Sequence, residues 1–202
     1  MKKTISLAMA LLLLLGSATA QPALEKLFSG HTAYLDGAAP GDISAGRRMD
    51  TAENGQHPYA VVITCSDSRV PAEHIFGAGL GDIFVIRTAG NVIGEFELGS
   101  VEYGAEHLHC KLVLVLGHTH CGAVDAAING GAHGNIAKIT DEISACLPEG
   151  CDAREAEILN VKNSISRIME SEIMQELLDK GETKVLGAIY DIESGEVNLL
   201  EE

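Results

Sequence analysis

The sequence predicts an α/β protein with a central, mostly parallel β-sheet flanked by helices. Short apolar runs rich in β-branched residues occupy 59–64, 82–87 and 111–117, and glycine or polar residues bound each of them. Such runs are typical of strands buried on both faces. Stretches with helical character separate them, and alternating strands and helices indicate parallel βαβ units.

The remaining elements are assigned from spacing. Helices are expected after each strand, at 71–76, 96–109, 123–128, 135–147 and 153–178. In the last of these, apolar residues recur at helical intervals. The stretch 184–200 is typical of a strand, a glycine-containing turn and a short final strand.

Two N-terminal segments are harder to place. The apolar segment 22–28 predicts a short helix with no obvious position in a single core, so we expect it to pack around a second copy of the chain. The segment 36–57 is rich in Gly, Asp and Ala, and is expected to be a surface connection.

The first twenty residues have the pattern of a secretory signal. Lys2 and Lys3 precede an apolar stretch that is short for a membrane span, and small residues end at Ala20. We therefore expect a signal peptide at 1–20, cleavage after Ala20, a single domain at 21–202 and a periplasmic location. An uncleaved anchor is the alternative, but no polar stop-transfer flank follows the apolar run.

The chain is strongly acidic. Without Lys2 and Lys3, 12 basic residues face 29 acidic ones, which gives a formal charge of −17 against −15 for the whole sequence. This balance argues against nucleic acid or an anionic membrane surface as a partner of the mature chain. A small neutral substrate is compatible with it.

Five cysteines form an odd set, so they cannot all pair. Cys146 and Cys151 flank a Pro/Gly turn and are the best disulfide candidates in an oxidising compartment. Cys110 precedes an apolar strand and is expected to be a small buried hydrophobe. Cys65 and Cys121 remain as the candidates for a catalytic or metal-binding role.

Metal-ligating residue types follow the first and third predicted strands. Cys65 ends the first, and His118 and Cys121 follow the third, at the sheet edge where ligands of parallel sheets gather. Two thiolates and an imidazole with an open fourth position are typical of catalytic zinc. Asp67 and Arg69 lie beside Cys65 and are expected to pair, because an unpaired buried charge is costly.

The motifs C-x-D-x-R at 65–69 and H-x-x-C at 118–121 resemble those of the β-class carbonic anhydrases. The likeness continues through blocks at 55–91, 99–108, 112–124 and 187–197, nearly the whole predicted mature chain. It implies one Zn²⁺ per subunit, held by Cys65, His118 and Cys121, with Asp67 and Arg69 as a catalytic dyad. It also places a further set around the substrate: Gln56, Phe84, Ala89, Tyr103 and Gly122.

For proton transfer we expect Tyr103 and His107, which are four residues apart on one predicted helix and share a face. His107 is the better titrating group. His120, next to the metal ligands, is the alternative.

The resemblance implies reversible hydration of CO₂ to bicarbonate and a proton, with zinc hydroxide attacking carbon. Zinc, two thiolates and a neutral imidazole sum to zero charge, so Asp67 is expected to help by holding the nucleophile. Asp67 is also expected to bind the metal itself at low pH, which would close the site. The family is usually dimeric or built from dimers, so a homodimer or homotetramer is expected.

Two other functions are compatible with the same residues. One is a related hydrolase of CS₂ or COS with the same zinc site. The other is a non-catalytic structural zinc or thiol-redox protein, which would require a closed site with four protein ligands.

Overall fold

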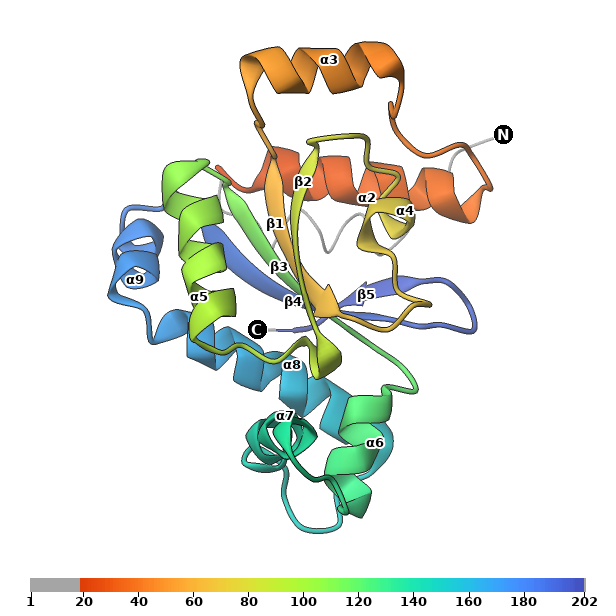
Figure 1. Ribbon diagram of the computed structural model, residues 1–202, viewed down its shortest axis with the longest axis vertical. Coiled ribbons are helices and arrows are strands. Elements are labelled where there is room, and N and C mark those ends of the chain that lie inside the picture. The colour runs from red at the N-terminus through yellow and green to blue at the C-terminus, as the bar shows by residue number, and fades with distance from the viewer. Residues whose placement is uncertain (1–18, 202) are drawn as a thin grey trace.

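The computed structural model describes residues 19–201, and most of the predicted signal peptide therefore lies outside the described residues. The chain forms a sheet with helices on both faces (Figure 1). One face is covered by α2 (Gln21–Leu35) and α4 (Ala72–Ile75). The other is covered by α5 (Glu95–Glu102), α8 (Ala153–Met169) and α9 (Glu172–Asp179).

The sheet has five strands in the order β2-β1-β3-β4-β5. Their bounds are β1 (Ala60–Cys65), β2 (Ile83–Thr88), β3 (Leu112–His118), β4 (Lys184–Tyr190) and β5 (Val197–Leu199). The first four strands are parallel, and β5 pairs antiparallel with β4. The predicted α/β class is confirmed, as is the strand, turn and strand at the C-terminal end.

Every residue of β1 and β3 is buried, which explains why their sequences are continuous apolar runs. Because successive side chains point to opposite faces, Val61 and Ile63 pack toward α5 and α8, whereas Val62 packs toward α2. The two central strands thus supply both layers of the core.

The helix predicted at 22–28 is longer than expected, and the expectation that it has no position in a single core is wrong. Leu24 and Leu27 of α2 are fully buried against the sheet of the same chain. Burying a leucine side chain stabilises a fold by about 2 kcal/mol, so α2 belongs to the core of a single copy. Sequence spacing alone did not reveal which sheet face it covers.

Two other expectations need correction. The segment predicted as a surface connection contains a helix, α3 (Ala45–Asn54), which begins where Ser44 Oγ accepts a hydrogen bond from the N–H of Arg47. The helix predicted at 153–178 is two helices, because Ser171 caps α9 by accepting from the N–H of Met174.

The helix after β2 is continuous but changes geometry. α5 runs on into a π-helical turn, η2 (Tyr103–His107). After β3 the chain forms the predicted helices α6 (Gly122–Asn129) and α7 (Asn135–Ser144). The predicted disulfide between Cys146 and Cys151 is absent: both are free, and Cys146 Sγ instead donates to the carbonyl of Ile143.

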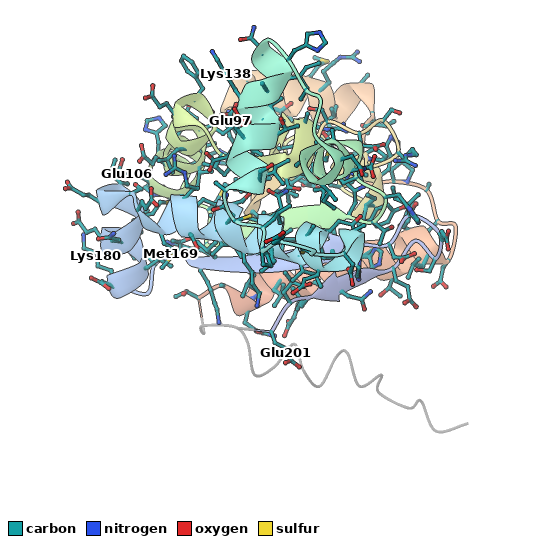
Figure 2. All side chains as sticks on the ribbon, turned by 90° about the horizontal axis from the view of Figure 1, so that it is seen from below. Glu97, Glu106, Lys138, Met169, Lys180 and Glu201 are labelled. Carbon is teal, nitrogen blue, oxygen red and sulfur yellow. The ribbon has the colours of Figure 1, made fainter. Side chains whose placement is uncertain are left out.

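Charged side chains surround the molecule, and Glu106, Lys180 and Glu201 point outward from it (Figure 2). Among the described residues, no helix combines the length and the apolar composition that crossing a bilayer requires.

Candidate metal centre

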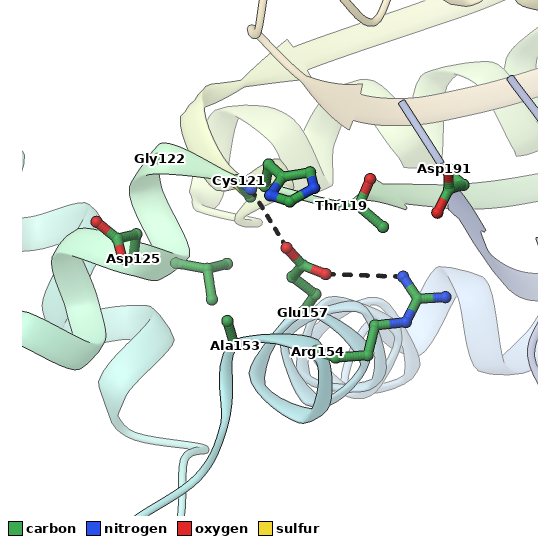
Figure 3. A pocket seen from close by; sticks show the side chains of 10 residues that line it. Thr119, Cys121, Gly122, Asp125, Ala153, Arg154, Glu157 and Asp191 are labelled. Atoms are coloured by element: carbon green, nitrogen blue, oxygen red, sulfur yellow. Dashed lines mark hydrogen bonds and ion pairs between the residues drawn. The ribbon is translucent and has the colours of Figure 1, made fainter. Parts of the chain in front are cut away.

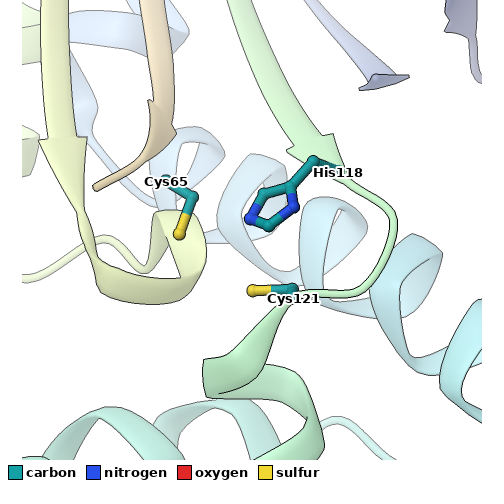
Figure 4. A group of neighbouring side chains, drawn as sticks. All are labelled: Cys65, His118 and Cys121. Carbon is teal, nitrogen blue, oxygen red and sulfur yellow. The ribbon is translucent and has the colours of Figure 1, made fainter. Parts of the chain in front are cut away.

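Three potential ligands meet at the carboxyl edge of the sheet (Figure 4). β1 and β3 are parallel neighbours, so their last residues, Cys65 and His118, end at the same edge. Cys121 follows as the N-cap of α6. One ligand atom from each of the three lies within 4.8 Å of the others, and all three residues are buried. We call Cys65, His118 and Cys121 the metal group.

The donor set fits zinc. His118 Nδ1 lies 2.8 Å from the carbonyl of Thr119, which leaves the lone pair on Nε2. That Nε2 is buried and without a hydrogen-bond partner among the described residues, and it faces the two thiols (Figure 4). A zinc-binding histidine characteristically donates its other ring N–H to a carbonyl in this way.

The pKa values of the two thiols are shifted in opposite directions. The pKa of Cys65 is lowered to about 4, chiefly by the adjacent Cys121 side chain, then by the His118 side chain and by the backbone N–H groups of Asp67 and Gly90. Those N–H groups lie 3.4 and 3.2 Å from Cys65 Sγ. The pKa of Cys121 is raised, first by the neighbouring Cys65 and then by burial. A divalent cation between the sulfurs would favour both thiolates.

The expected pair of Asp67 and Arg69 is confirmed. Arg69 Nε and Nη2 donate to the two carboxylate oxygens at 3.0 and 2.8 Å, and Arg69 N donates at 2.9 Å. The Arg69 side chain lowers the pKa of Asp67 to about 2. Asp67 Oδ2 lies 3.9 Å from His118 Nε2, so the anionic carboxylate borders the metal group.

Arg87 is a residue that sequence reasoning missed. Its Nε donates to the carbonyl of Cys65 at 3.1 Å, and its Nη2 donates to the carbonyl of Asp67 at 2.7 Å. It therefore holds the loop that carries both residues. The available signal was an arginine near the end of an apolar strand, at the edge where ligands gather.

A second missed residue lies behind the metal loop. Glu157 of α8 is buried, and its Oε1 accepts from the N–H of Cys121 at 3.3 Å, while Oε2 lies 3.7 Å from Arg154. It lines a surface pocket with His120 and Gly122 (Figure 3). Nothing in the local sequence marks this glutamate, because its partner is 36 positions away.

Two of the predicted substrate residues lie beside the metal group. Ala89 begins the short helix η1 (Ala89–Asn91), whose next N–H reaches Cys65 Sγ. Gly122 is the first residue of α6, directly after Cys121, and it is exposed.

The other predicted residues form a separate group at the opposite end of the strands. Phe84 pairs with Val61, four residues before Cys65 and therefore about 13 Å away along the strand. The ring of Tyr103 lies 6.0 Å from that of Phe84 and stacks 4.8 Å from that of His107. Gln56 precedes β1 and is exposed. A single chain thus does not bring these four residues to its own metal group.

His120, the alternative proton carrier, is exposed. Its Nε2 lies 3.6 Å from a carboxylate oxygen of Glu193, and its backbone carbonyl accepts from Arg69 Nη2 at 3.1 Å.

Comparison with known proteins gives one consistent result. The family profile described as carbonic anhydrase matches residues 60–197. Carbonic anhydrase 2 of Mycobacterium tuberculosis is 38% identical over 152 residues, which cover 70% of this chain and 73% of that protein.

Solved structures agree. A β-carbonic anhydrase of Aspergillus fumigatus is 31% identical, with a TM-score of 0.70 over 77% of this chain and 81% of that chain. A β-carbonic anhydrase of Sordaria macrospora, described as tetrameric, has the same fold, with 23% identity and a TM-score of 0.66 over 90% of this chain and 95% of that chain.

Proposed function

Because this chain belongs to the β-class carbonic anhydrases, whose cofactor is zinc, we propose that Cys65, His118 and Cys121 bind one zinc ion per subunit for reversible hydration of CO₂. The observation that carries the assignment is the buried Cys-His-Cys group, with the lone pair of His118 directed at two sulfurs. When bound, zinc supplies a Lewis acid that activates water for attack near neutral pH.

Asp67 orients the nucleophile. Its pKa of about 2 keeps the carboxylate ionised at any physiological pH. It is therefore available to accept a hydrogen bond from the attacking water. Arg69 holds it in place, and the carbonyl of His120 fixes Arg69 in turn. While Arg69 holds Asp67, a zinc ion bound by Cys65, His118 and Cys121 would keep a position open for water, unlike a structural site with four protein ligands.

Gly122 and Ala89 line the side of the metal group at which CO₂ binds. The first N–H groups of a helix have no partner within the helix, so the N–H of Gly122 at the start of α6 can donate to an oxygen of CO₂ or bicarbonate. The methyl of Ala89 keeps the adjoining wall apolar, which suits neutral CO₂.

We further infer that the site is completed by a second copy of the chain, in a homodimer or homotetramer. Gln56, Phe84, Tyr103 and His107 lie too far from the metal group of their own chain, so they serve the metal group of the other copy. There Gln56 and Phe84 contact substrate, and Tyr103 with His107 passes protons outward.

Exposed apolar surface supports this assembly. Phe96 is 88% exposed and Met49 is 62% exposed, and α3 has no buried residue in the single chain. Contact between copies would cover such surface.

The test of the metal site compares Cys65→Ser with Cys110→Ser, a matched change at a buried cysteine outside the group. Metal analysis and stopped-flow CO₂ hydration should show loss of most zinc and activity in the first variant only. Stoichiometric zinc in Cys65→Ser would show that Cys65 is not a zinc ligand. Wild-type activity on CS₂ or COS without CO₂ hydration would favour the related hydrolase, and zinc without either activity would favour a structural role.

We also propose that residues 1–20 direct export and that the mature enzyme is periplasmic. The support is the charged, apolar and small-residue pattern of these residues. Cell fractionation with mass measurement of the isolated protein should find it in the periplasm with Gln21 at its N-terminus. A cytoplasmic protein that retains residues 1–20 would contradict the proposal.

A further inference from the structure

Helix α8 carries a row of buried polar side chains that the proposed chemistry does not use. Glu157, Asn160 and Ser164 are spaced by three and four residues, so they share one helix face. None is more than 5% exposed. Buried polar groups require partners. Glu157 bonds to the backbone of a potential metal ligand, Cys121, whereas Asn160 and Ser164 bond to the backbone of the turn that contacts Cys65.

Two of them hold the turn after β2. Asn160 Nδ2 donates to the carbonyl of Gly90 at 2.7 Å. Ser164 Oγ donates to the carbonyl of Asn91 at 2.8 Å and accepts from Asn91 Nδ2 at 3.3 Å. Consecutive carbonyls of the turn are therefore each fixed by a side chain of α8.

The turn needs such support because its backbone is unusual. Gly90 and Asn91 both have left-handed conformations, with φ of 68° and 47°. Asn91 pays a steric penalty there that glycine avoids. A Cβ on Gly90 would also lie 2.8 Å from Ile143 Cδ1, so the turn is packed closely against its neighbours.

The held turn acts on a metal ligand. Its Gly90 N–H lies 3.2 Å from Cys65 Sγ and donates to it. A hydrogen bond to a thiolate draws charge away from a bound cation, and it also fixes the direction of the sulfur lone pairs. Glu157 acts on the other loop, since it accepts from the N–H of Cys121.

We propose that Asn160 and Ser164 are positioning residues for the metal. They hold the Gly90–Asn91 turn so that its N–H bonds to Cys65 Sγ, and they thereby set zinc affinity and the charge that this thiolate donates. The inference rests on the proposed function, because it takes Cys65 as a zinc ligand.

The test uses Asn160→Leu and Ser164→Ala, which remove the donors. The same helix offers matched controls: Asn163→Leu at a half-buried position and Ser166→Ala at an exposed one. Competition with a chelator should show zinc bound 10–100-fold more weakly (roughly the range for lost outer partners of metal ligands) in the first pair only.

A spectroscopic readout separates positioning from simple packing. In the cobalt(II)-substituted protein, the sulfur-to-metal charge-transfer band should move to longer wavelength in Ser164→Ala, because a thiolate that loses a hydrogen bond gives up an electron more easily. The control Ser166→Ala should keep the wild-type band. Both measurements need only metal binding and not turnover.

Each outcome decides the matter. Unchanged zinc affinity and an unchanged band in Ser164→Ala overturn the proposal, whether or not its melting temperature falls. If Asn160→Leu does not fold, Ser164→Ala still decides, since it removes a single oxygen atom. A cobalt band of unchanged position and intensity in Cys65→Ser would instead overturn the assignment of Cys65 as a ligand, because Cys121 would then supply the whole band.

Discussion

Asp67 receives three hydrogen bonds from Arg69, and its carboxylate borders the metal group without belonging to the three-ligand set. Replacement by Asn keeps the shape of the side chain but removes the anionic acceptor. We expect Asp67→Asn to retain zinc and to lower CO₂ turnover by about 10²-fold, the scale for losing one preorganised group.

The matched control is Glu170→Gln, which changes an exposed carboxylate that also pairs with an arginine, Arg167. Zinc content and stopped-flow hydration should be normal in that variant. Turnover of Asp67→Asn near the wild-type value would rule out the proposed role of the carboxylate.

Cys65 and Cys121 should be vulnerable once the metal is removed. Their Sγ atoms lie within 4.8 Å of each other, and the S–S bond of a disulfide is about 2.05 Å long. Only a small movement of the two sulfurs is therefore needed. The low pKa of Cys65 supplies the reactive thiolate. Air oxidation of chelator-treated protein, followed by peptide mass mapping, should find these two residues joined.

Cys110 is the internal reference for that experiment. Burial raises its pKa to about 11, and its Sγ donates to the carbonyl of Pro58, so it should remain a thiol. Recovery of Cys65 and Cys121 as free thiols after the same treatment would refute the expectation.

Among the elements, α2 is joined to the rest of the fold by a buried histidine. His31 Nδ1 lies 3.0 Å from the carbonyl of Ile75 in α4, and its Nε2 accepts from the N–H of Val197 in β5 at 3.1 Å. This arrangement requires the neutral ring. Burial lowers the pKa of His31, although the Ile75 carbonyl and the charge of Glu196 partly oppose it.

A histidine with a lowered folded-state pKa makes stability depend on pH. The unfolded chain binds the proton near pH 6.5 and the folded chain resists it, so the free energy of unfolding should fall as pH drops below about 6.5. Urea unfolding at pH 7.5 and 5.5 should show a smaller loss in His31→Gln than in the wild type. The exposed control His133→Gln should lose as much as the wild type, and equal losses in all three would contradict the prediction.

At the scale of the whole molecule, the predicted site residues fall into two groups at opposite ends of the strands. If each active site takes its metal group from one copy and Gln56 from the other, two defective variants can complement each other. In a twofold dimer of Cys65→Ser with Gln56→Ala, one of the two sites contains both intact parts.

Mixing the two variants under conditions that allow subunit exchange should therefore give more CO₂ hydration than the sum of the separate proteins. The control mixture pairs Cys65→Ser with Cys121→Ser, in which every site lacks a ligand. If the first mixture gains nothing although exchange is demonstrated, both groups do not act in one shared site.

The sequence by itself determined the α/β class, the five strands and the residues of the metal group. These depend on local properties: β-branched apolar runs, helical spacing, and chemical residue types placed just after strands. Because parallel neighbours end at one edge, residues 53 positions apart, Cys65 and His118, could be predicted to meet. Asp67 and Arg69 pair across only two positions, which is again a local property.

Only the tertiary structure decided the rest. It placed α2 inside the core, separated Tyr103 and His107 from the metal group of their own chain, and joined Asn160 to Gly90 across 70 positions. Such contacts depend on which helix covers which sheet face and on how each helix is rotated about its axis. No short sequence window contains that information, because it arises only when distant segments pack together.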